Sequence, residues 1–306
     1  MHLVIPFAAP LSNAGRHALG ALTLPALESL LTRLAPAERN DGDEYQLSPP
    51  HERVLGKALG WAGADGALPW AAQAAAADGI DTGKLAWGLL SPVHWHVGRD
   101  AITMGDPEAL ALDEAESRAY FDAVRPLFES LGWRAAWGAP TRWYVAHESL
   151  TALPTASLDR VEGRNPDLWM PGHPGAGLVK RLQNEVQMLL YTHALNDARE
   201  SEGRDTLNSF WLSGCGVRQP ARHAAPDVID TLRAPALRED WEAWAEAWRA
   251  LDAGPLREAL QGDAAWSLTL CGERHAQTYI RQPRGWLHGL RSRFGGPRAA
   301  ALLKEL

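Results

Sequence analysis

Three polar side chains in the second half of the chain, His193, Asn196 and Arg199, have types and a spacing that could bind an anion. The apolar spacing upstream predicts a helix over 178–193, so the row stands at the end of that helix. Residues three apart on a helix differ by only about 60° in direction, so imidazole, amide and guanidinium can share one side. This combination suits phosphate or oxyanion recognition. A structural interpretation is also open: His193 would face the core, and Arg199 would balance the partial negative charge at the C-terminus of the helix.

His94 and His96 alternate on a predicted strand over 93–97, so both point to one face, as two ligands of a metal ion would. No third ligand is evident nearby apart from Asp100 or Asp106. Two half-exposed strand histidines without a ligand are the simpler interpretation.

Two further features have both a functional and a structural interpretation. Gly-Cys-Gly at 214–216 could place a nucleophilic Cys215 on a tight turn. A strand end whose backbone packs closely against another part of the molecule is the simpler explanation of the two glycines. Trp241, Trp244 and Trp248 could form a binding platform. Their spacing is also that of the core face of an amphipathic helix, and we favour the core.

Composition narrows the class of protein. The 306 residues carry 30 Lys and Arg against 37 Asp and Glu, a formal net charge of −7, which disfavours binding to nucleic acid. With 46% hydrophobic residues the chain can bury a large core. Cys215 and Cys271 are too few for a disulfide framework or a zinc site, and we expect a reduced, cytoplasmic protein. We expect no secretory leader and no membrane span, because Pro6 and Pro10 interrupt the first apolar run and no run approaches 18 residues.

Predicted strands and helices alternate along the chain, which favours an α/β fold with a mainly parallel sheet. Residues 91–149 show a strand–helix–strand–strand pattern of their own. Residues 153–177 are rich in Pro and Gly, which predicts a long connecting loop. We therefore expect a core domain formed by 1–90 and 150–306, with 91–149 inserted as a small α+β domain. The main expected strands are 2–8, 85–90, 133–137, 142–147, 209–213 and 266–271, and the main expected helices are 19–34, 52–59, 69–77, 113–131, 178–193 and 240–252.

The segment from Leu189 to Gly216 resembles cofactor-independent phosphoglycerate mutases of the archaeal type, in which His, Asn and Arg precede a short Gly turn and an aromatic strand ends in Gly-x-Gly. The corresponding positions here are His193, Asn196, Arg199, Gly203, Asn208, Trp211, Gly214 and Gly216. The resemblance implies a fold of the alkaline-phosphatase superfamily: a central, mainly parallel sheet with helices on both faces. It also points to His193, Asn196, Arg199, Asn208, Gly214 and Gly216 as a candidate anion grip.

The chain departs from that family where the family binds two metal ions. Active members open with a strand that ends in Asp-Gly, whereas this strand ends Pro6-Phe7-Ala8-Ala9-Pro10. Their late Asp-x-x-x-His pair has no histidine counterpart within 228–239, and their final Asp-His is replaced by Arg274-His275. His275 is thus only a weak metal candidate. A mutase-like scaffold without this site also resembles the RpfE-type bacterial regulatory proteins.

The sequence therefore predicts a cytoplasmic bacterial pseudoenzyme, a phosphoglycerate mutase-like regulatory protein that binds a protein partner or a small phosphorylated ligand. No catalytic residue is identified and no cofactor is expected. The alternative is a metal-dependent phosphoryl transferase or phosphate-ester hydrolase with a rebuilt site, which would require Mn or Zn. A nucleic-acid-associated regulator is the least favoured class.

Overall fold

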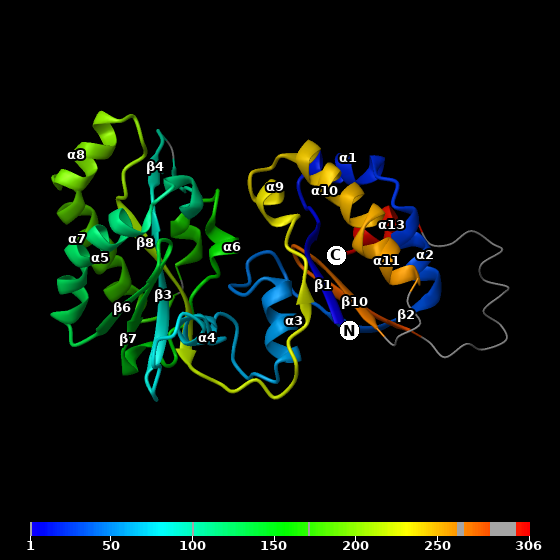
Figure 1. The fold of residues 1–306 in the computed structure, drawn as a ribbon, viewed down its shortest axis with the longest axis horizontal. Coiled ribbons are helices and arrows are strands. Elements are labelled where there is room, and N and C mark those ends of the chain that lie inside the picture. Colours follow the sequence, from blue (N-terminus) through cyan, green and yellow to red (C-terminus); the bar gives the residue numbers. More distant parts are fainter. Residues whose placement is uncertain (1, 100, 171, 262–265, 282–297) are drawn as a thin grey trace. The chain divides into compact units, whose positions relative to one another are not determined.

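The computed structural model describes residues 2–99, 101–170, 172–261, 266–281 and 298–306. They form a mixed α/β structure that divides into two compact units. Unit 1 comprises residues 1–44, 49–60 and 222–306, and unit 2 comprises residues 45–48 and 61–221. Figure 1 shows the elements of each unit. Among the described residues, no helix has both the length and the apolar character needed to cross a membrane.

Unit 1 is built on a five-stranded sheet in the order β2-β11-β10-β1-β9. Strand β1 runs parallel to β9 and β10, whereas β11 is antiparallel to both β10 and β2. The strands are β1 (His2–Ala9), β2 (Leu34–Asn40), β9 (Asp227–Val228), β10 (Ser267–Gly272) and β11 (Ala276–Arg281). The helices are α1 (Asn13–Ala21), α2 (Pro25–Arg33), α3 (Pro50–Ala58), α9 (Arg233–Leu237), α10 (Trp241–Ala253), α11 (Pro255–Gln261) and α13 (Ala299–Leu303).

Alternation along β1 gives this sheet two buried faces. Leu3 and Ile5 point into a core with α1, α2, α10, α11 and α13, while Val4 points to the opposite face, against α3. Trp244 and Trp248 are fully buried in the larger core and Trp241 packs at its margin. The core interpretation of the tryptophan stripe is thus confirmed.

Unit 2 is built on a four-stranded antiparallel sheet in the order β6-β7-β3-β8, with a separate two-stranded ribbon, β4-β5. The strands are β3 (Ala86–Val93), β4 (Trp95–Val97), β5 (Ile102–Met104), β6 (Arg134–Ala139), β7 (Arg142–Ala146) and β8 (Ser209–Val217). The α-helices are α4 (Trp70–Ala77), α5 (Glu114–Glu129), α6 (Leu158–Val161), α7 (Ala176–Tyr191) and α8 (Ala194–Ser201). Single 3-10 turns are η1 (Pro107–Leu110), η2 (Glu148–Leu150) and η3 (Pro166–Trp169).

Helices cover both faces of the unit 2 sheet. Trp143 and Val145 join a core with α5 and α7, whereas Tyr144 and Ala146 join a smaller core with α4. Figure 1 shows α5 and α7 on one side of the sheet and α4 on the other. The α/β class and the helices on both faces agree with the sequence prediction. The expectation of one mainly parallel sheet is wrong, because parallel pairing in the described strands is confined to β1 and the other pairs are antiparallel.

The expected division into 1–90 plus 150–306 with 91–149 inserted also needs correction. Strand β3 crosses the expected boundary at residue 90 and pairs with β7, inside the expected insert, and with β8, outside it. This shared sheet holds 91–149 within unit 2, and the chain divides near residues 60 and 221 instead.

Candidate functional site

The end of β1 and the turn from β10 to β11 form the edge at which the resemblance implies two metal ions, and protein contacts fill it. The backbone N–H of Leu11 donates to the carboxylate of Glu273 at 2.9 Å. Arg274 pairs with Glu44 through N–O contacts of 2.8 and 3.0 Å. The backbone N–H groups of Arg274 and His275 both donate to the backbone oxygen of Leu306. The two charged side chains of this turn are therefore engaged within the chain.

His275, the weak metal candidate, already has contacts within the chain at its Nδ1. The N–H of Gly42 donates to its Nδ1 at 3.2 Å, and burial lowers the pKa of His275. Asp41 also approaches Nδ1 to 3.2 Å, but a nitrogen that accepts from Gly42 carries no proton for a carboxylate. The ring proton then sits on Nε2, so coordination through Nε2 would require loss of the Gly42 bond.

A two-metal centre needs several carboxylates and imidazoles around each ion. No group of three or more such side chains occurs at this edge in the described residues. The residues at this edge therefore do not fit the two-metal site that the resemblance to phosphoglycerate mutases implies.

The row His193, Asn196 and Arg199 does not lie on one helix. Helix α7 ends at Tyr191, and His193 is the N-cap of α8, where its side chain accepts from the N–H of Leu195. The expected helix therefore breaks at residue 192, and the three side chains are not presented as a row.

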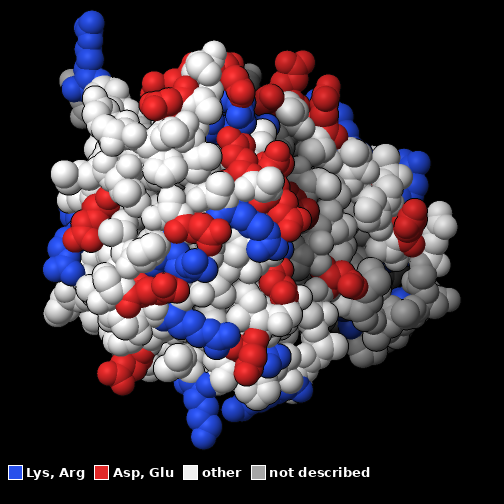
Figure 2. Space-filling model, turned by 60° about the vertical axis from the view of Figure 1, so that its left-hand side comes forward, with Lys and Arg blue, Asp and Glu red and all other residues white. Residues whose placement is uncertain are grey.

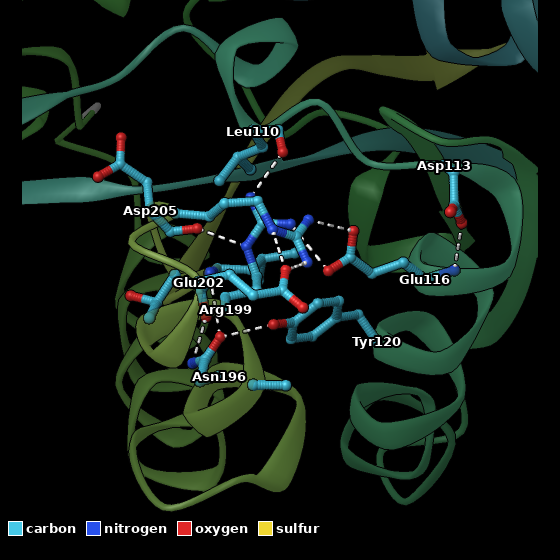
Figure 3. A network of polar contacts seen from close by, with 12 residues as sticks. Leu110, Asp113, Glu116, Tyr120, Asn196, Arg199, Glu202 and Asp205 are labelled. Atoms are coloured by element: carbon cyan, nitrogen blue, oxygen red, sulfur yellow. Dashed lines mark hydrogen bonds and ion pairs between the residues drawn. The ribbon is translucent and has the colours of Figure 1, made fainter.

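The side chains of Arg199 and Asn196 are buried in unit 2 and hydrogen-bonded there (Figure 3). Arg199 is 1% exposed and donates to the Glu116 carboxylate at 2.9 Å and to the backbone oxygens of Leu110 and Asp205 at 2.6 and 2.5 Å. The Glu116 carboxylate also pairs with Arg204. Because this guanidinium is buried and three of its five N–H groups bind within the chain, it is not accessible to an incoming phosphate.

Asn196 has a complete set of partners of its own. Its amide donates to the backbone oxygens of Leu190 and Leu207, and its oxygen accepts from the Leu207 N–H and from the Tyr120 hydroxyl. Burial raises the pKa of Tyr120 to about 12, so this hydroxyl remains a donor. The network holds α8, α5 and the start of β8 together. In this structure His193, Asn196 and Arg199 do not form an anion grip.

The other predicted grip residues also have structural partners. Asn208 accepts from the N–H of Trp95 and donates to its backbone oxygen, at 2.7 and 3.0 Å. Gly214 has φ +63°, and a Cβ there would lie 2.9 Å from the backbone nitrogen of Ala71; a Cβ at Gly216 would lie 3.0 Å from Pro69. These glycines let β8 approach the start of α4 closely. Asn208, in turn, ties β4 to the start of β8.

Cys215, between the two glycines, is not an activated nucleophile. Its side chain is buried, and burial raises its pKa to about 12. A nucleophilic cysteine needs the opposite shift and access to substrate. The interpretation as a closely packed strand end is supported.

His94 and His96 do share one face, and Asp205 completes a group of three. The ring centroids of the two histidines are 4.5 Å apart, and one ligand atom of each of the three residues lies within 4.8 Å of the others. Of the two residues expected as a third ligand, Asp106 caps η1 through the N–H of Glu108, and Asp100 lies outside the described residues. Sequence reasoning missed Asp205 because pairing of β3 with β8 brings its loop to the histidines.

Comparison with known proteins finds no matching family model and no matching curated protein. Among solved structures, a cofactor-independent phosphoglycerate mutase from Thermoplasma acidophilum matches at 16% identity and a TM-score of 0.38, over 100% of this chain and 98% of that one. The PH0037 protein from Pyrococcus horikoshii matches at 14% identity and a TM-score of 0.49, over 98% of this chain and 92% of that one. At these values the likenesses transfer no activity to this chain and do not place it in the mutase family.

Proposed function

We propose that this protein is a non-catalytic, phosphoglycerate mutase-like protein that acts by binding rather than by phosphoryl transfer. The observation that carries the proposal is the edge formed by the end of β1 and the β10–β11 turn. Glu273 binds the Leu11 N–H, Arg274 pairs with Glu44, and His275 accepts from Gly42. Each group in the place of a metal ligand thus has a partner in the chain.

Electrostatics at this edge also disfavour two dications. Two adjacent metal ions require anionic ligands to compensate their charge, and here Arg274 adds a cation beside the carboxylates. Strand β1 supplies no acidic side chain, and Glu28, the first one along the chain, binds the N–H of Ala299. Without metal ions, neither an attacking oxygen nor the phosphoryl group would be activated.

A protein partner fits the structure better than a phosphorylated ligand at the predicted grip, because Arg199 and Asn196 are used internally. A separate cavity of about 390 Å³ in unit 1 is lined by residues that include His2, Glu38, Lys57 and His223. Lys57 pairs with Glu38 at 2.5 Å, so its charge is already matched. This cavity is better suited to a neutral polar group than to phosphate.

One observation favours the alternative of a metal-dependent phosphoryl transferase or phosphate-ester hydrolase with a rebuilt site. His94, His96 and Asp205 are residue types that bind a catalytic metal ion. The nucleic-acid alternative gains no support: on the face seen in Figure 2, Lys and Arg side chains are interspersed with Asp and Glu.

The test is an assay of purified full-length protein with added Mn²⁺ or Zn²⁺, using phosphoglycerate and p-nitrophenyl phosphate as substrates. We expect no turnover above the level of a preparation of the Asp205→Asn and His275→Ala double variant. Metal-dependent turnover that His275→Ala abolishes would contradict the proposal. Turnover abolished by Asp205→Asn alone would instead establish the rebuilt-site alternative.

A further inference from the structure

We infer that His94, His96 and Asp205 form a binding site for a single divalent transition-metal ion, such as Zn²⁺. The three residues belong to unit 2: His94 lies between β3 and β4, His96 lies in β4, and Asp205 lies in the loop between α8 and β8. The inference does not rest on the proposed function, because the observation that carries that proposal is the edge of unit 1 formed by the end of β1 and the β10–β11 turn.

The spacing of the three side chains suits one ion. Ligand atoms placed tetrahedrally at about 2.1 Å from a metal lie roughly 3.4 Å apart. The ligand atoms here lie within 4.8 Å of one another, and His96 and Asp205 are exposed side chains that can rotate to close the remaining gap.

His94 is already held in the tautomer that a metal requires. Its Nδ1 lies 2.6 Å from the backbone oxygen of Thr206. A carbonyl oxygen can only accept, so Nδ1 carries the proton and Nε2 keeps its lone pair. Histidine ligands in proteins are commonly oriented in this way, by a bond from the second ring nitrogen to a carbonyl or carboxylate.

The segments that carry the ligands are fastened to one another. Asn208 binds both backbone groups of Trp95, the residue between the two histidines. Arg199 binds the backbone oxygen of Asp205, and the carboxylate of Asp205 points away from Arg199 (Figure 3). The residues predicted to grip an anion therefore act as positioning residues for the loop and ribbon that carry the three ligands.

Space around the histidine rings is also preserved. Gly105 donates its N–H to the backbone oxygen of His94 at 2.8 Å. A Cβ at residue 105 would lie 3.1 Å from Nε2 of His96, so the absence of a side chain leaves the His96 ring free to turn.

The donor set selects the class of metal. Two imidazoles and one carboxylate favour Zn²⁺, Co²⁺ or Ni²⁺ over Mg²⁺ and Ca²⁺, which prefer all-oxygen ligands. Three protein ligands leave a fourth tetrahedral position for water or a ligand atom.

The experiment uses the untagged full-length protein, stripped with a chelator, dialysed and titrated with Zn²⁺ by calorimetry and with Co²⁺ by visible absorption. We expect one equivalent per chain, and at least tenfold weaker binding in Asp205→Asn and in His96→Ala. Both residues are exposed, so these variants should fold normally, whereas His94→Ala also removes the bond to Thr206.

His17→Ala, an exposed histidine on α1, is the matched control and should bind like the wild type. No binding, or binding that Asp205→Asn and His96→Ala leave unchanged, would overturn the inference. Metal lost instead on His275→Ala would overturn it as well and would also count against the proposed function.

Discussion

The guanidinium of Arg199 and the carboxylate of Glu116 form an ion pair inside unit 2, with 2.9 Å between Nη1 and Oε1. The pair joins α8 to α5, and the same guanidinium fixes the backbone oxygens of Leu110 and Asp205. Arg199, a residue type that often binds phosphate, thus holds together the elements around the candidate metal site.

Arg199→Ala should lower the free energy of unfolding by about 3–5 kcal/mol, because it leaves Glu116 and two backbone oxygens without their buried donor. Arg199→Lys should also be destabilising, since one ammonium group cannot reproduce the three-way geometry. Urea unfolding measures both. Arg204→Ala is the control: Arg204 pairs with the same carboxylate but is partly exposed, so this variant should lower the free energy of unfolding much less. Equal losses for the two arginines would contradict a structural role for Arg199.

Asp78 should make stability depend on pH in the acid range. Hydrogen bonds from Arg142, and then from Tyr144, lower the pKa of Asp78 below 3.8. A carboxylate with a lowered pKa contributes stability above its unfolded-state pKa, and this contribution is lost as the pH falls through the folded-state value. Asp78→Asn should therefore cost about 1 kcal/mol at pH 7, because Arg142 is partly exposed to water, and progressively less as the pH falls below the unfolded-state pKa of Asp78. Urea unfolding of both proteins at a series of acid pH values tests this; a difference that stays constant or grows as the pH falls would refute it.

Both cysteines should be unreactive in the folded protein. Each is a buried free thiol, and burial raises the pKa of both, that of Cys215 to about 12. With a disulfide reagent such as DTNB at pH 8, we expect no rapid labelling of the native chain and two thiols after addition of guanidinium. Rapid labelling of one native thiol, lost in Cys215→Ser, would restore the nucleophile hypothesis.

Gly214→Ala should be more destabilising than Gly132→Ala. Both glycines have positive φ, +63° and +77°, so each substitution carries a backbone cost of about 1–2 kcal/mol. At Gly132 nothing lies within 4 Å of the added carbon, whereas at Gly214 it meets the backbone of Ala71 at 2.9 Å. Overpacking should add about 1–3 kcal/mol at Gly214 alone. Equal thermal stability of the two variants would show that β8 and α4 are not closely packed.

Elements with a strong apolar period could be predicted from the sequence. The helix expected over 113–131 is α5, capped by Asp113, and the strand expected over 142–147 is β7, whose side chains alternate between two cores. Strands β2 and β11 were not predicted. The β2 segment, Leu34–Asn40, is mostly exposed and lacks alternation, because an edge strand buries little on either face. The single helix expected over 19–34 is instead the end of α1 followed by α2, because the backbone is extended at Leu22 and the second helix begins only at Pro25.

The candidate sites were harder to predict, since contacts between distant segments determine them. Spacing correctly placed His94 and His96 on one face, but Asp205 meets them only through pairing of β3 with β8. The family resemblance, added to the spacing, pointed to Arg199 as a ligand-binding residue, whereas its guanidinium pairs with Glu116, which is distant in the sequence. A polar residue's type predicts what it can bind, but only the fold decides whether the partner is a ligand or the chain itself.

The most direct test of the non-catalytic proposal is the metal content of the protein after mild dialysis, measured for the wild type, Asp205→Asn and His275→Ala. The structure predicts at most one equivalent of Zn²⁺ or Mn²⁺ per chain, reduced by Asp205→Asn and unchanged by His275→Ala. Close to two equivalents, lost on His275→Ala together with turnover of phosphoglycerate or p-nitrophenyl phosphate, would contradict it.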